Sequence, residues 1–467
     1  MEEQHFDVAI IGGGPAGYGA ALYGASAGLK VALAENDLVG GTCLHRGCIP
    51  AKELLETASI VRTVRRAGEF GVEVDGKAVD WTRTLARKQE VIDRLTGGVV
   101  QLLKGRKVDV FDATATLGAN RSVRLVGSNG EETTISADAV ILASGSRPRI
   151  IPGFEPDGVR VVSSDEFFHI AQVPLDAVVV GGGAIGCEFA STLSDLGSKV
   201  TILEALPKIL PGCDQDVTRA VQQSFKKRGI EVRTGVSVTG HTPNVTGTSV
   251  HLDGRESLET NLVVVSVGRV PNTENLLAEG TGVEITERGH IAVQDGYRTG
   301  EPKVWAIGDV IDTPQLAHVG FAEAIVAIKD ILGEDPQPVD NSRVPWAIYC
   351  HPEVAFAGHS EESAKEAGID VVTSKHRFSA NSRAMIIDDT EGLVKIIAAR
   401  NDDGTAGQVL GVHMVGPWVT EQLSGGYLAV NWEATVDEVA AFIQPHPSLS
   451  ELFGESVLSL TGRSLHG

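Results

Sequence analysis

Cysteine is scarce in this sequence, with five residues among 467. Such a low content excludes a small secreted scaffold held together by disulfides, in which cysteines are dense. Cys187, Cys213 and Cys350 are scattered along the chain, and we expect them to pack as small buried side chains. Cys43 and Cys48 lie close together and require a separate explanation.

The sequence also lacks long hydrophobic runs and a net excess of positive charge. No apolar stretch approaches the length of a membrane-spanning helix. The sequence begins Met-Glu-Glu-Gln-His, an acidic start unlike a signal peptide or an Arg-rich transit peptide, so we expect a cytoplasmic protein. The formal net charge of -21 disfavours nucleic acid or an anionic membrane surface as a partner.

The length of the chain indicates several domains. A single hydrophobic core rarely serves 467 residues, because domains usually contain roughly 100–200 residues each. The hydrophobic share of 42% and the charged share of 22% are those of an ordinary globular protein. We therefore expect about three or four folded units.

A nucleotide-binding unit is predicted at the start of the chain. The β-branched run 6–11 predicts a buried parallel strand, and Gly-Gly-Gly-Pro-Ala-Gly follows it. An Ala-rich helical segment and a second strand then lead to Glu35. This order predicts a dinucleotide site, with a pyrophosphate at the helix N-terminus and a ribose hydroxyl at the acidic residue. The residues expected to line it are Gly12, Gly14, Pro15, Ala16, Gly17 and Glu35.

The same unit recurs at residues 177–204. A short apolar strand precedes Gly-Gly-Gly-Ala-Ile-Gly, a helix runs to Leu196, Gly197 ends it, and a second strand ends at Glu204. Two such coincidences favour two dinucleotide sites over chance glycine-rich turns. The second set of candidate residues is Gly181, Gly183, Ala184, Ile185, Gly186 and Glu204.

The acidic residue of the second unit selects its cofactor. Glu204 would repel a 2′-phosphate but can accept a hydrogen bond from a free 2′-hydroxyl, and the nearest following cation is Lys208. NAD is therefore favoured over NADP. The first unit precedes the close cysteine pair, which suggests a permanently held redox cofactor, and FAD is the natural candidate.

Two further strands end in turns that fit this interpretation. Residues 304–309 read as a strand that runs into Gly-Asp, a way to present Asp309 to a polyol chain. Residues 141–146 read as a strand that ends in a small-residue turn containing Ser144 and Gly145. Each segment alone is equally compatible with an ordinary tight turn.

The cysteine pair allows three interpretations. Two unrelated loop cysteines are possible, and so is a metal site, although no second Cys/His pair at ligand spacing accompanies them. The third is a redox disulfide between Cys43 and Cys48, which would exclude regular helix over 43–48, because five residues of α-helix rise roughly 7.5 Å. We also expect Arg46 to add positive potential that favours a thiolate.

Taken together, these segments resemble the pyridine nucleotide–disulfide oxidoreductases, and most closely the dihydrolipoamide dehydrogenases among them. The resemblance covers nearly the whole chain. It rests on both glycine turns, on the redox motif around Cys43 and Cys48, and on four further motifs: Gly-Arg-Val-Pro-Asn at 268–272, Ala-Ile-Gly-Asp at 306–309, His-Pro-Glu-Val-Ala at 351–355 and His-Pro-Ser-Leu-Ser-Glu at 446–451.

The resemblance implies an α/β fold with two Rossmann-like domains, a central domain and a C-terminal α+β dimerisation domain. The implied ranges are 1–150 for the FAD domain with its redox disulfide, 151–275 for the NAD domain, 276–345 for the central domain and 346–467 for the interface domain. By similarity, Gly41, Thr42, Cys43 and Lys52 of the redox motif also contact FAD.

Other roles follow from the same resemblance. Glu188 would pair with Lys52 beside the flavin, and Asp309 would bind the FAD ribitol. Ala317 and His318 would offer backbone groups to the isoalloxazine, and Gly268 would lie in the NAD site.

The sequence departs from the family pattern at three places. His45-Arg46 stands between the cysteines where Asn-Val is usual, which bears on the redox potential and the protein partner. Ala51 replaces Ser. The glycine-rich turn that contacts the adenine is Ala-Thr-Ala at 113–115, where the backbone of Ala115 can serve.

The implied reaction is the oxidation of protein-bound dihydrolipoamide by NAD. A base must make the attacking thiolate, and His446 is the candidate, with Glu451 accepting from its other ring nitrogen. Family members place this pair in the partner subunit's site, so we expect a homodimer with shared sites and a cis His446-Pro447 bond. The lipoyl group would arrive on a separate lipoyl domain of a 2-oxo acid dehydrogenase complex or on the lipoyl carrier of a glycine cleavage system.

Rival functions are distinguishable in the sequence. Mercuric reductases carry a C-terminal cysteine pair that this chain lacks, and glutathione reductases favour NADPH, against which Glu204 argues. A quinone reductase or transhydrogenase need not retain the cysteines and the His446–Glu451 pair. A non-catalytic subunit of a multienzyme complex has no use for the intact set.

Overall fold

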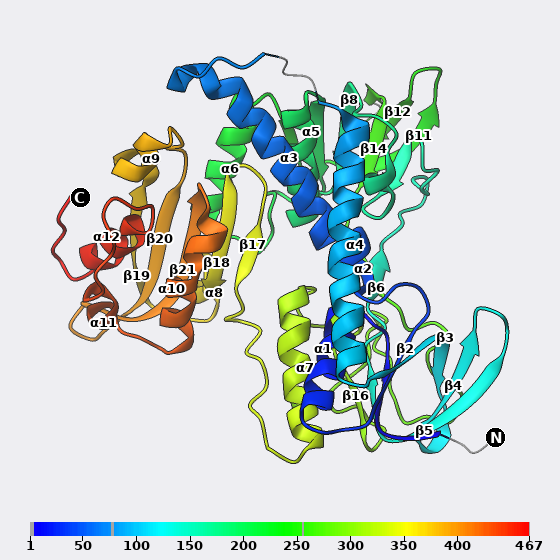
Figure 1. The fold of residues 1–467 in the computed structure, drawn as a ribbon. Coiled ribbons are helices and arrows are strands. Elements are labelled where there is room, and N and C mark those ends of the chain that lie inside the picture. The colour runs from blue at the N-terminus through cyan, green and yellow to red at the C-terminus, as the bar shows by residue number, and fades with distance from the viewer. Residues whose placement is uncertain (1–3, 76–78, 255, 467) are drawn as a thin grey trace. The chain divides into compact units, whose positions relative to one another are not determined.

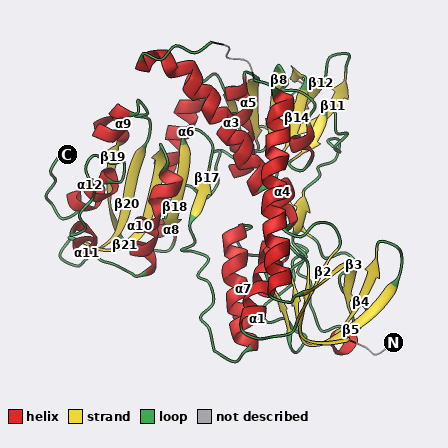
Figure 2. Ribbon diagram, viewed as in Figure 1, coloured by secondary structure: helices red, strands yellow, loops and turns green. Residues whose placement is uncertain are grey.

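The computed structural model describes residues 4–75, 79–254 and 256–466, so the acidic start at residues 1–3 lies outside the described residues. The chain divides into two compact units. The first contains Met1–Glu53, Asp80–Arg149 and Gly268–Asn341, and the second contains Leu54–Val79, Ile150–Val267 and Ser342–Gly467. Figures 1 and 2 show their helices and strands.

The first unit is built on a parallel sheet in the order β3-β2-β1-β5-β16, and β4 joins β3 to β5 by antiparallel pairing. A dinucleotide-binding sheet wound outward from its first strand has this order. Its strands are β1 (Gln4–Ile11), β2 (Val31–Glu35), β3 (Asp109–Leu117), β4 (Ser122–Gly127), β5 (Glu132–Leu142) and β16 (Val304–Ala306), with a separate pair formed by β6 (Ser146–Pro148) and β15 (Arg269–Pro271).

Helices cover this sheet because its central strands are apolar on both faces. Val8 and Ala9 of β1, whose side chains point to opposite faces of the sheet, are at most 1% exposed. The helices of the unit are α1 (Pro15–Ser26), α2 (Gly41–Arg46), α4 (Trp81–Gly105) and α7 (Ala317–Ile331). Helices α1 and α7 lie side by side (Figure 1), and small residues permit the approach, since a Cβ on Gly320 would lie 3.1 Å from the Cβ of Ala16.

The segment expected as a central domain, 276–345, contributes β16 and α7 to the first unit. This arrangement returns a distant part of the chain to the first nucleotide-binding sheet. The proposed boundaries between the four domains remain a prediction.

The second unit contains the duplicate of the nucleotide-binding sheet. Its strands run parallel in the order β10-β9-β8-β14-β7, which repeats the order of the first sheet. These strands are β7 (Val161–Ser163), β8 (Asp176–Val180), β9 (Lys199–Glu204), β10 (Glu231–Thr234) and β14 (Leu262–Val265), with the antiparallel β11 (Val238–Pro243), β12 (Thr248–Leu252) and β13 (Ser257–Thr260) beside them in sequence. The predicted internal duplication is confirmed.

Three helices accompany this part of the second unit: α3 (Cys48–Arg66), α5 (Ala184–Leu196) and α6 (Gln215–Lys227). Helix α3 starts at the second cysteine of the pair and crosses from the first unit into the second. Helix α5 ends at Gly197, as predicted, with the left-handed φ of +107° that favours glycine.

The C-terminal part of the second unit is α+β, as expected. Its antiparallel sheet has the order β17-β18-β21-β20-β19. The strands are β17 (Trp346–Ile348), β18 (Glu353–Gly358), β19 (Val371–Arg377), β20 (Leu393–Arg400) and β21 (Ala406–Gly416), and the helices are α8 (Glu361–Glu366), α9 (Ser382–Ile386), α10 (Val419–Asn431), α11 (Val436–Ala440) and α12 (Glu451–Ser459). Helix α10 packs on β18 and β21, while α12 packs on β19 and β20.

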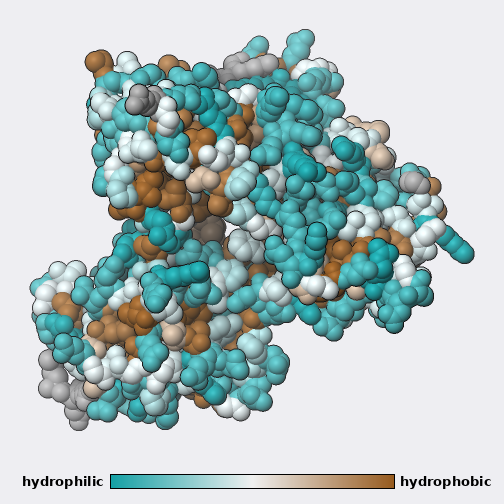
Figure 3. All heavy atoms as spheres, turned by 180° about the vertical axis from the view of Figure 1, so that it is seen from behind, coloured by the Kyte–Doolittle hydropathy of each residue, from teal (hydrophilic) through white to brown (hydrophobic). Residues whose placement is uncertain are grey.

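The surface alternates between hydrophilic areas and brown apolar patches on the face that Figure 3 displays. In the C-terminal part, the exposed apolar side chains include Met385, Ile386, Trp418, Leu428, Trp432, Phe442 and Ile443. Within the described part of the chain, no helix is both long and apolar enough to cross a membrane.

Candidate active site

The first glycine turn has the geometry of a phosphate cradle. Gly12 has φ +106°, and a Cβ there would lie 2.2 Å from the carbonyl oxygen of Ala143. A Cβ on Gly17 would lie 1.8 Å from the carbonyl oxygen of Gly12, so helix α1 packs tightly on the turn. A Cβ on Gly14, by contrast, has only one neighbour, at 4.0 Å. The first and third glycines therefore serve the packing, and the second leaves room for a ligand to approach the backbone.

The second turn repeats this geometry. Gly181 also has φ +106°, and a Cβ on Gly186 would lie 1.9 Å from the carbonyl oxygen of Gly181. Nothing lies within 4 Å of a Cβ built on Gly183. Ala184 and Ile185 begin α5, as Pro15 and Ala16 begin α1. Because unpaired N–H groups and the positive end of each helix point at these openings, both fit a pyrophosphate.

The two acidic residues end their strands beside the turns. Oε2 of Glu35 accepts the N–H of Gly13 at 2.6 Å, and Oε2 of Glu204 accepts the N–H of Gly182 at 2.6 Å. Each carboxylate is thereby fixed at the edge of the sheet where a ribose would lie next to the bound pyrophosphate. This matches the predicted position of both residues, and their hydrogen bonds to ribose remain predictions.

Asp309 is held in place by a hydroxyl. It lies in the short turn Gly308–Val310 after β16, and its Oδ2 accepts from Oγ of Ser146 at 2.6 Å. Nε of Arg269 donates to the same hydroxyl at 2.7 Å. Ser146 and Arg269 were not predicted as site residues from the sequence, although Ser146 ends the strand-turn segment 141–146 and Arg269 belongs to the 268–272 motif. Their hydrogen bonds orient the carboxylate that we expect at the ribitol of FAD.

The small-residue turn after β5 is tied to the 268–272 motif. Oγ of Ser144 donates to the carbonyl oxygen of Asn272 at 2.7 Å, and Nδ2 of Asn272 donates to the carbonyl oxygen of Ser144 at 3.0 Å. Gly145 has φ +71° and open space where a Cβ would point. Gly268, with φ +100°, comes shortly after β14 in the chain. Ala317 is the first residue of α7, and its backbone N–H belongs to the unpaired first turn of that helix.

The turn expected at 113–115 is not present. These residues lie within β3, where Ala115 pairs with Leu125 of β4. The prediction was wrong because Ala-Thr-Ala lacks the glycines that would interrupt a strand. Pairing of β3 with β2 ends at Asp112, and the N–H of Leu117 points away from β4 to Leu276. Alternate residues of a strand direct their backbone groups to the same edge, so Ala115 directs its backbone to the same side as Leu117. This edge is not paired with β2 beyond Asp112, and the backbone of Ala115 there remains suited to contact an adenine.

The cysteine pair straddles a break between two helices. Cys43 lies in α2, Cys48 begins α3, and Gly47 between them has φ -141° and ψ -110°. The predicted departure from regular helix is therefore confirmed. A Cβ on Gly41 would lie 2.6 Å from the Cα of Gly14, so this segment adjoins the first glycine turn. Both cysteines are thiols in this structure, and the predicted disulfide between them is not formed.

The two thiols interact with each other. The hydrogen bond that the Cys43 thiol donates to the sulfur of Cys48, together with the burial of the side chain, raises the pKa of Cys43, and the positive charge of Lys52 opposes that rise. Burial, together with the nearby sulfurs, also raises the pKa of Tyr18 to about 12, so its hydroxyl stays neutral at the edge of the pair. Cys43 in this dithiol form therefore needs a base before it can act as a thiolate.

The residues between the cysteines have other partners than expected. The guanidinium of Arg46 forms an ion pair with Asp37, and Nε2 of His45 lies 2.9 Å from the carbonyl oxygen of Val39. Among the cations, Lys52 is the one that lowers the pKa of Cys43 most, and the expectation that Arg46 favours a thiolate remains a prediction. Through these contacts, His45 and Arg46 connect α2 with the preceding segment that contains Asp37 and Val39.

His446 and Glu451 form the predicted pair. Nδ1 of the imidazole lies 2.7 Å from Oε1 of Glu451, and the His446-Pro447 bond is cis, as expected. Oε2 of Glu451 accepts the N–H of Ser448 at 2.7 Å. Burial acts to raise the pKa of Glu451, but the hydrogen bonds from Ser448 and His446 outweigh it and hold that pKa below its usual range. The side chain of His446 is 72% exposed, so its Nε2 is free to meet a substrate.

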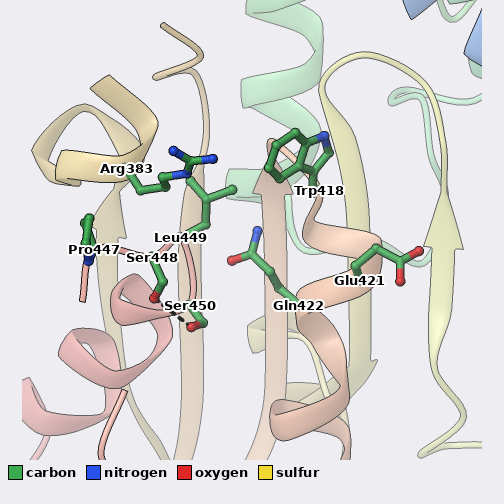
Figure 4. Close-up of a pocket in the computed structure, with 8 residues that line it drawn as sticks. All are labelled: Arg383, Trp418, Glu421, Gln422, Pro447, Ser448, Leu449 and Ser450. Carbon is green, nitrogen blue, oxygen red and sulfur yellow. Dashed lines mark hydrogen bonds between the residues drawn. The ribbon is translucent and has the colours of Figure 1, made fainter. Parts of the chain in front are cut away.

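A shallow pocket adjoins this pair (Figure 4). Its volume is about 300 Å³, and Oγ of Ser448 and Oγ of Ser450 lie 2.9 Å apart at its wall. The pocket is lined by Arg383, Trp418, Glu421, Gln422, Pro447, Ser448, Leu449 and Ser450. Because Pro447 follows the imidazole directly, this is the concave surface next to the candidate base.

Glu188 is almost fully buried in α5, at 5% exposure, and its Oε1 accepts the N–H of Tyr349 at 2.9 Å. Lys52 lies in α3 near the thiols. These two residues belong to different units, as do Cys43 and His446, and both predicted pairings remain predictions. No cluster of three or more His, Cys, Asp or Glu side chains arranged for a metal ion occurs among the described residues.

Comparison with known protein families places the chain. The family model described as pyridine nucleotide-disulphide oxidoreductase matches residues 6–324, and its dimerisation domain matches residues 344–457. The chain belongs to the pyridine nucleotide-disulphide oxidoreductase family. FAD and NAD are therefore its cofactors, as the two glycine turns predicted, and the dimerisation domain supports a homodimer.

Relatives that match over nearly the full length of the chain are more specific than the family models. A dihydrolipoyl dehydrogenase of Bacillus subtilis is 41% identical, with 99% of each chain covered, and one of Zymomonas mobilis is 38% identical with the same coverage. Among solved structures, LpdA from Mycobacterium tuberculosis has a TM-score of 0.91 at 26% identity, covering 98% of this chain and 99% of that one. The HOCl-induced flavoprotein disulfide reductase RclA from Escherichia coli has a TM-score of 0.85 at 27% identity, covering 97% and 99%.

We expect cofactor preference to follow Glu204. A 2′-phosphate beside this carboxylate costs several kcal/mol of like-charge repulsion, so kcat/KM should favour NAD over NADP by about 100-fold or more. Replacing Glu204 with Gln should reduce that ratio. The duplicate offers a matched control: Glu35→Gln should weaken FAD binding and leave the NAD/NADP ratio unchanged. Equal efficiency of the native protein with both nucleotides would place Glu204 outside the ribose site.

Proposed function

We propose that the protein is a dihydrolipoamide dehydrogenase, which oxidises a protein-bound dihydrolipoyl group and reduces NAD. The observation that carries the proposal is the exposed imidazole of His446, hydrogen-bonded to Glu451, in a chain that also retains Cys43 and Cys48. Enzymes that pass electrons only between nucleotides and quinones need neither a base nor a dithiol. The full-length relatives that are named dihydrolipoyl dehydrogenase support the same conclusion.

The cofactor sites are assigned by their fit to the ligands. The first glycine turn, with Gly41, Thr42, Ser144, Gly145, Asp309 and Ala317, holds FAD, and the second turn, with Glu204 and Gly268, holds NAD. FAD held there would supply the two-electron redox chemistry that connects the Cys43–Cys48 dithiol with NAD. The charged pair Lys52 and Glu188 lies beside the flavin in this proposal.

The thiol chemistry is an exchange of disulfides. In the oxidised enzyme of this proposal, a disulfide joins Cys43 to Cys48. His446 takes a proton from one substrate thiol, and the resulting thiolate attacks Sγ of Cys43, so the Cys43–Cys48 bond breaks and Cys48 leaves as a thiolate. The second substrate thiol then attacks the substrate sulfur of the mixed disulfide, and its proton is transferred to the departing Sγ of Cys43, which releases lipoamide and leaves Cys43 as a thiol. Glu451 keeps Nδ1 protonated and stabilises the imidazolium, because its own low pKa keeps it ionised.

The homodimer completes the site in this proposal. Cys43 and Cys48 of one protomer meet His446 of the partner subunit, held by Glu451 of the partner subunit. The substrate is a lipoyl group carried on another protein, a lipoyl domain of a 2-oxo acid dehydrogenase complex or the lipoyl carrier of a glycine cleavage system. The domain ranges proposed for this architecture are 1–150, 151–275, 276–345 and 346–467.

One set of assays tests the proposal. We expect the purified protein to form NADH from dihydrolipoamide and NAD, measured by absorbance at equal enzyme concentration. Glutathione disulfide, mercuric ion and quinones, each supplied with NADH, serve as rival substrates, and NADP replaces NAD as a control. A protein that reduces one of these rivals efficiently and fails with dihydrolipoamide is another flavoprotein disulfide or quinone reductase.

A further inference from the structure

Glu323 is a buried carboxyl group without a role in the chemistry described above. It lies on α7, six residues after Ala317, and its exposure is 0%. Acidic side chains are almost never fully buried unless a partner compensates their charge. No ion pair to Glu323 is present in the described part of the chain. Its position therefore requires a different explanation from that of a structural salt bridge.

The contact of Glu323 is with the turn that carries Asp309. Its Oε2 accepts the N–H of Gly308 at 2.6 Å. Gly308 has φ +73°, and a Cβ there would lie 2.9 Å from the Cβ of Ala16, so this turn is pressed against the start of α1. The turn is thus held from two sides, by Ser146 on the carboxylate of Asp309 and by Glu323 on the preceding N–H.

The surroundings of Glu323 indicate the protonation state in which its carboxyl group holds the turn. Neither Oε1 of Glu323 nor Oγ1 of Thr313 has a partner with the distance and angles of a regular hydrogen bond among the described residues, although the hydroxyl of Thr313 is close enough to lower the pKa of Glu323. Burial raises the pKa of Glu323 to about 7, with Asp309 adding to the rise and the hydrogen bond from Gly308 opposing it. Tyr297 of the turn η4 (Asp295–Tyr297), packed on α7, also interacts with Glu323 and has a raised pKa of about 12, so it brings no charge.

We propose that Glu323 is a positioning residue for FAD, which holds the Gly308–Asp309 turn as a neutral acid. The proton resides on Oε1, because Oε2 is the acceptor of Gly308. In this arrangement the carboxyl orients the turn without placing a second negative charge behind Asp309. The inference rests on the proposed function in one respect, the assignment of Asp309 to the ribitol of FAD.

The test measures release of FAD, followed by the fluorescence of the freed cofactor, from protein purified with its flavin. Glu323→Ala should accelerate release by about tenfold, since the buried N–H of Gly308 loses its acceptor. Glu323→Gln retains an acceptor and should restore the native rate at pH 6. As the pH is raised from 6 to 8, release of FAD from the native protein should become faster, because Glu323 loses its proton and places a negative charge beside Asp309 and the FAD phosphates. Release from Glu323→Gln should not change over this pH range.

Asp330→Ala is the matched control. The side chain of Asp330, on the same helix, is 8% exposed; it forms an ion pair with Arg298 and accepts from Nε1 of Trp305 at 2.8 Å, with no hydrogen bond to Gly308. Equal acceleration in Asp330→Ala and Glu323→Ala, failure of Glu323→Gln to restore release at pH 6, or a native rate without pH dependence would each overturn the inference. Asp309→Ala distinguishes a failure of this inference from a failure of the proposed function. If Asp309→Ala leaves FAD release unchanged, the assignment of Asp309 to the ribitol of FAD is wrong.

Discussion

Replacing His446 with Gln is expected to lower the rate of dihydrolipoamide oxidation by about 10³-fold, within the range of 10²–10⁴ typical of a general base. The reason is the state of the substrate: dihydrolipoamide arrives as a dithiol, and one of its thiols must lose a proton before it can attack Sγ of Cys43, so proton transfer has to be assisted. Glutamine keeps the polarity and approximate size of the side chain but cannot accept the proton. Steady-state formation of NADH from dihydrolipoamide measures the loss.

A second reaction of the same protein supplies the control. Electron transfer from NADH to an artificial acceptor requires the two nucleotide sites and neither the base nor the dithiol, so His446→Gln should leave its rate unchanged. Glu451→Gln should give a smaller loss with dihydrolipoamide, because the 2.7 Å contact with Nδ1 can persist while the charge that stabilises the imidazolium is removed. If His446→Gln retains the native rate with dihydrolipoamide, the base lies elsewhere.

The nucleotide-binding units could be predicted because their information is local. A β-branched strand, a glycine turn, a helix and an acidic residue follow one another without interruption, and the third glycine of each turn has a geometric reason that acts within this local segment. A Cβ on Gly17 or on Gly186 meets the first glycine of its own turn. The helix end at Gly197 and the strand end at Glu204 were predicted for the same reason.

Contacts between distant segments left weaker signals in the sequence. Ser146 reaches Asp309 across 163 positions, and Glu323 resembles any acidic residue of an amphipathic helix until the fold buries it. The ion pair of Arg46 with Asp37, nine positions earlier in the chain, was not expected from the sequence. At 113–115 the error was one of local structure, since a strand continued where the family resemblance implied a turn.

The proposed architecture predicts that each active site is formed by residues of two subunits, and mixing of variants tests this directly. The imidazole of His446 bonds Glu451 of its own chain through Nδ1 and is 72% exposed, so its Nε2 can face another subunit. In a two-fold dimer, each site would combine the cysteines of one protomer with the partner subunit's His446. Two inactive parents, Cys43→Ser and His446→Gln, should then restore activity when their subunits exchange. One site of the mixed dimer carries both lesions and the other carries neither.

Random exchange of equal amounts of the two parents should restore about one quarter of the native activity, because half of the dimers are mixed and each has one intact site of two. The same mixing of Cys43→Ser with Cys48→Ser is the matched control. Cys43 and Cys48 belong to one chain segment, so every site of that mixed dimer keeps a lesion and no activity should return. Subunit exchange is verified independently with differently tagged parents. If exchange is complete and the first mixture stays inactive, His446 acts within its own protomer or has no part in the reaction, and the shared site is wrong.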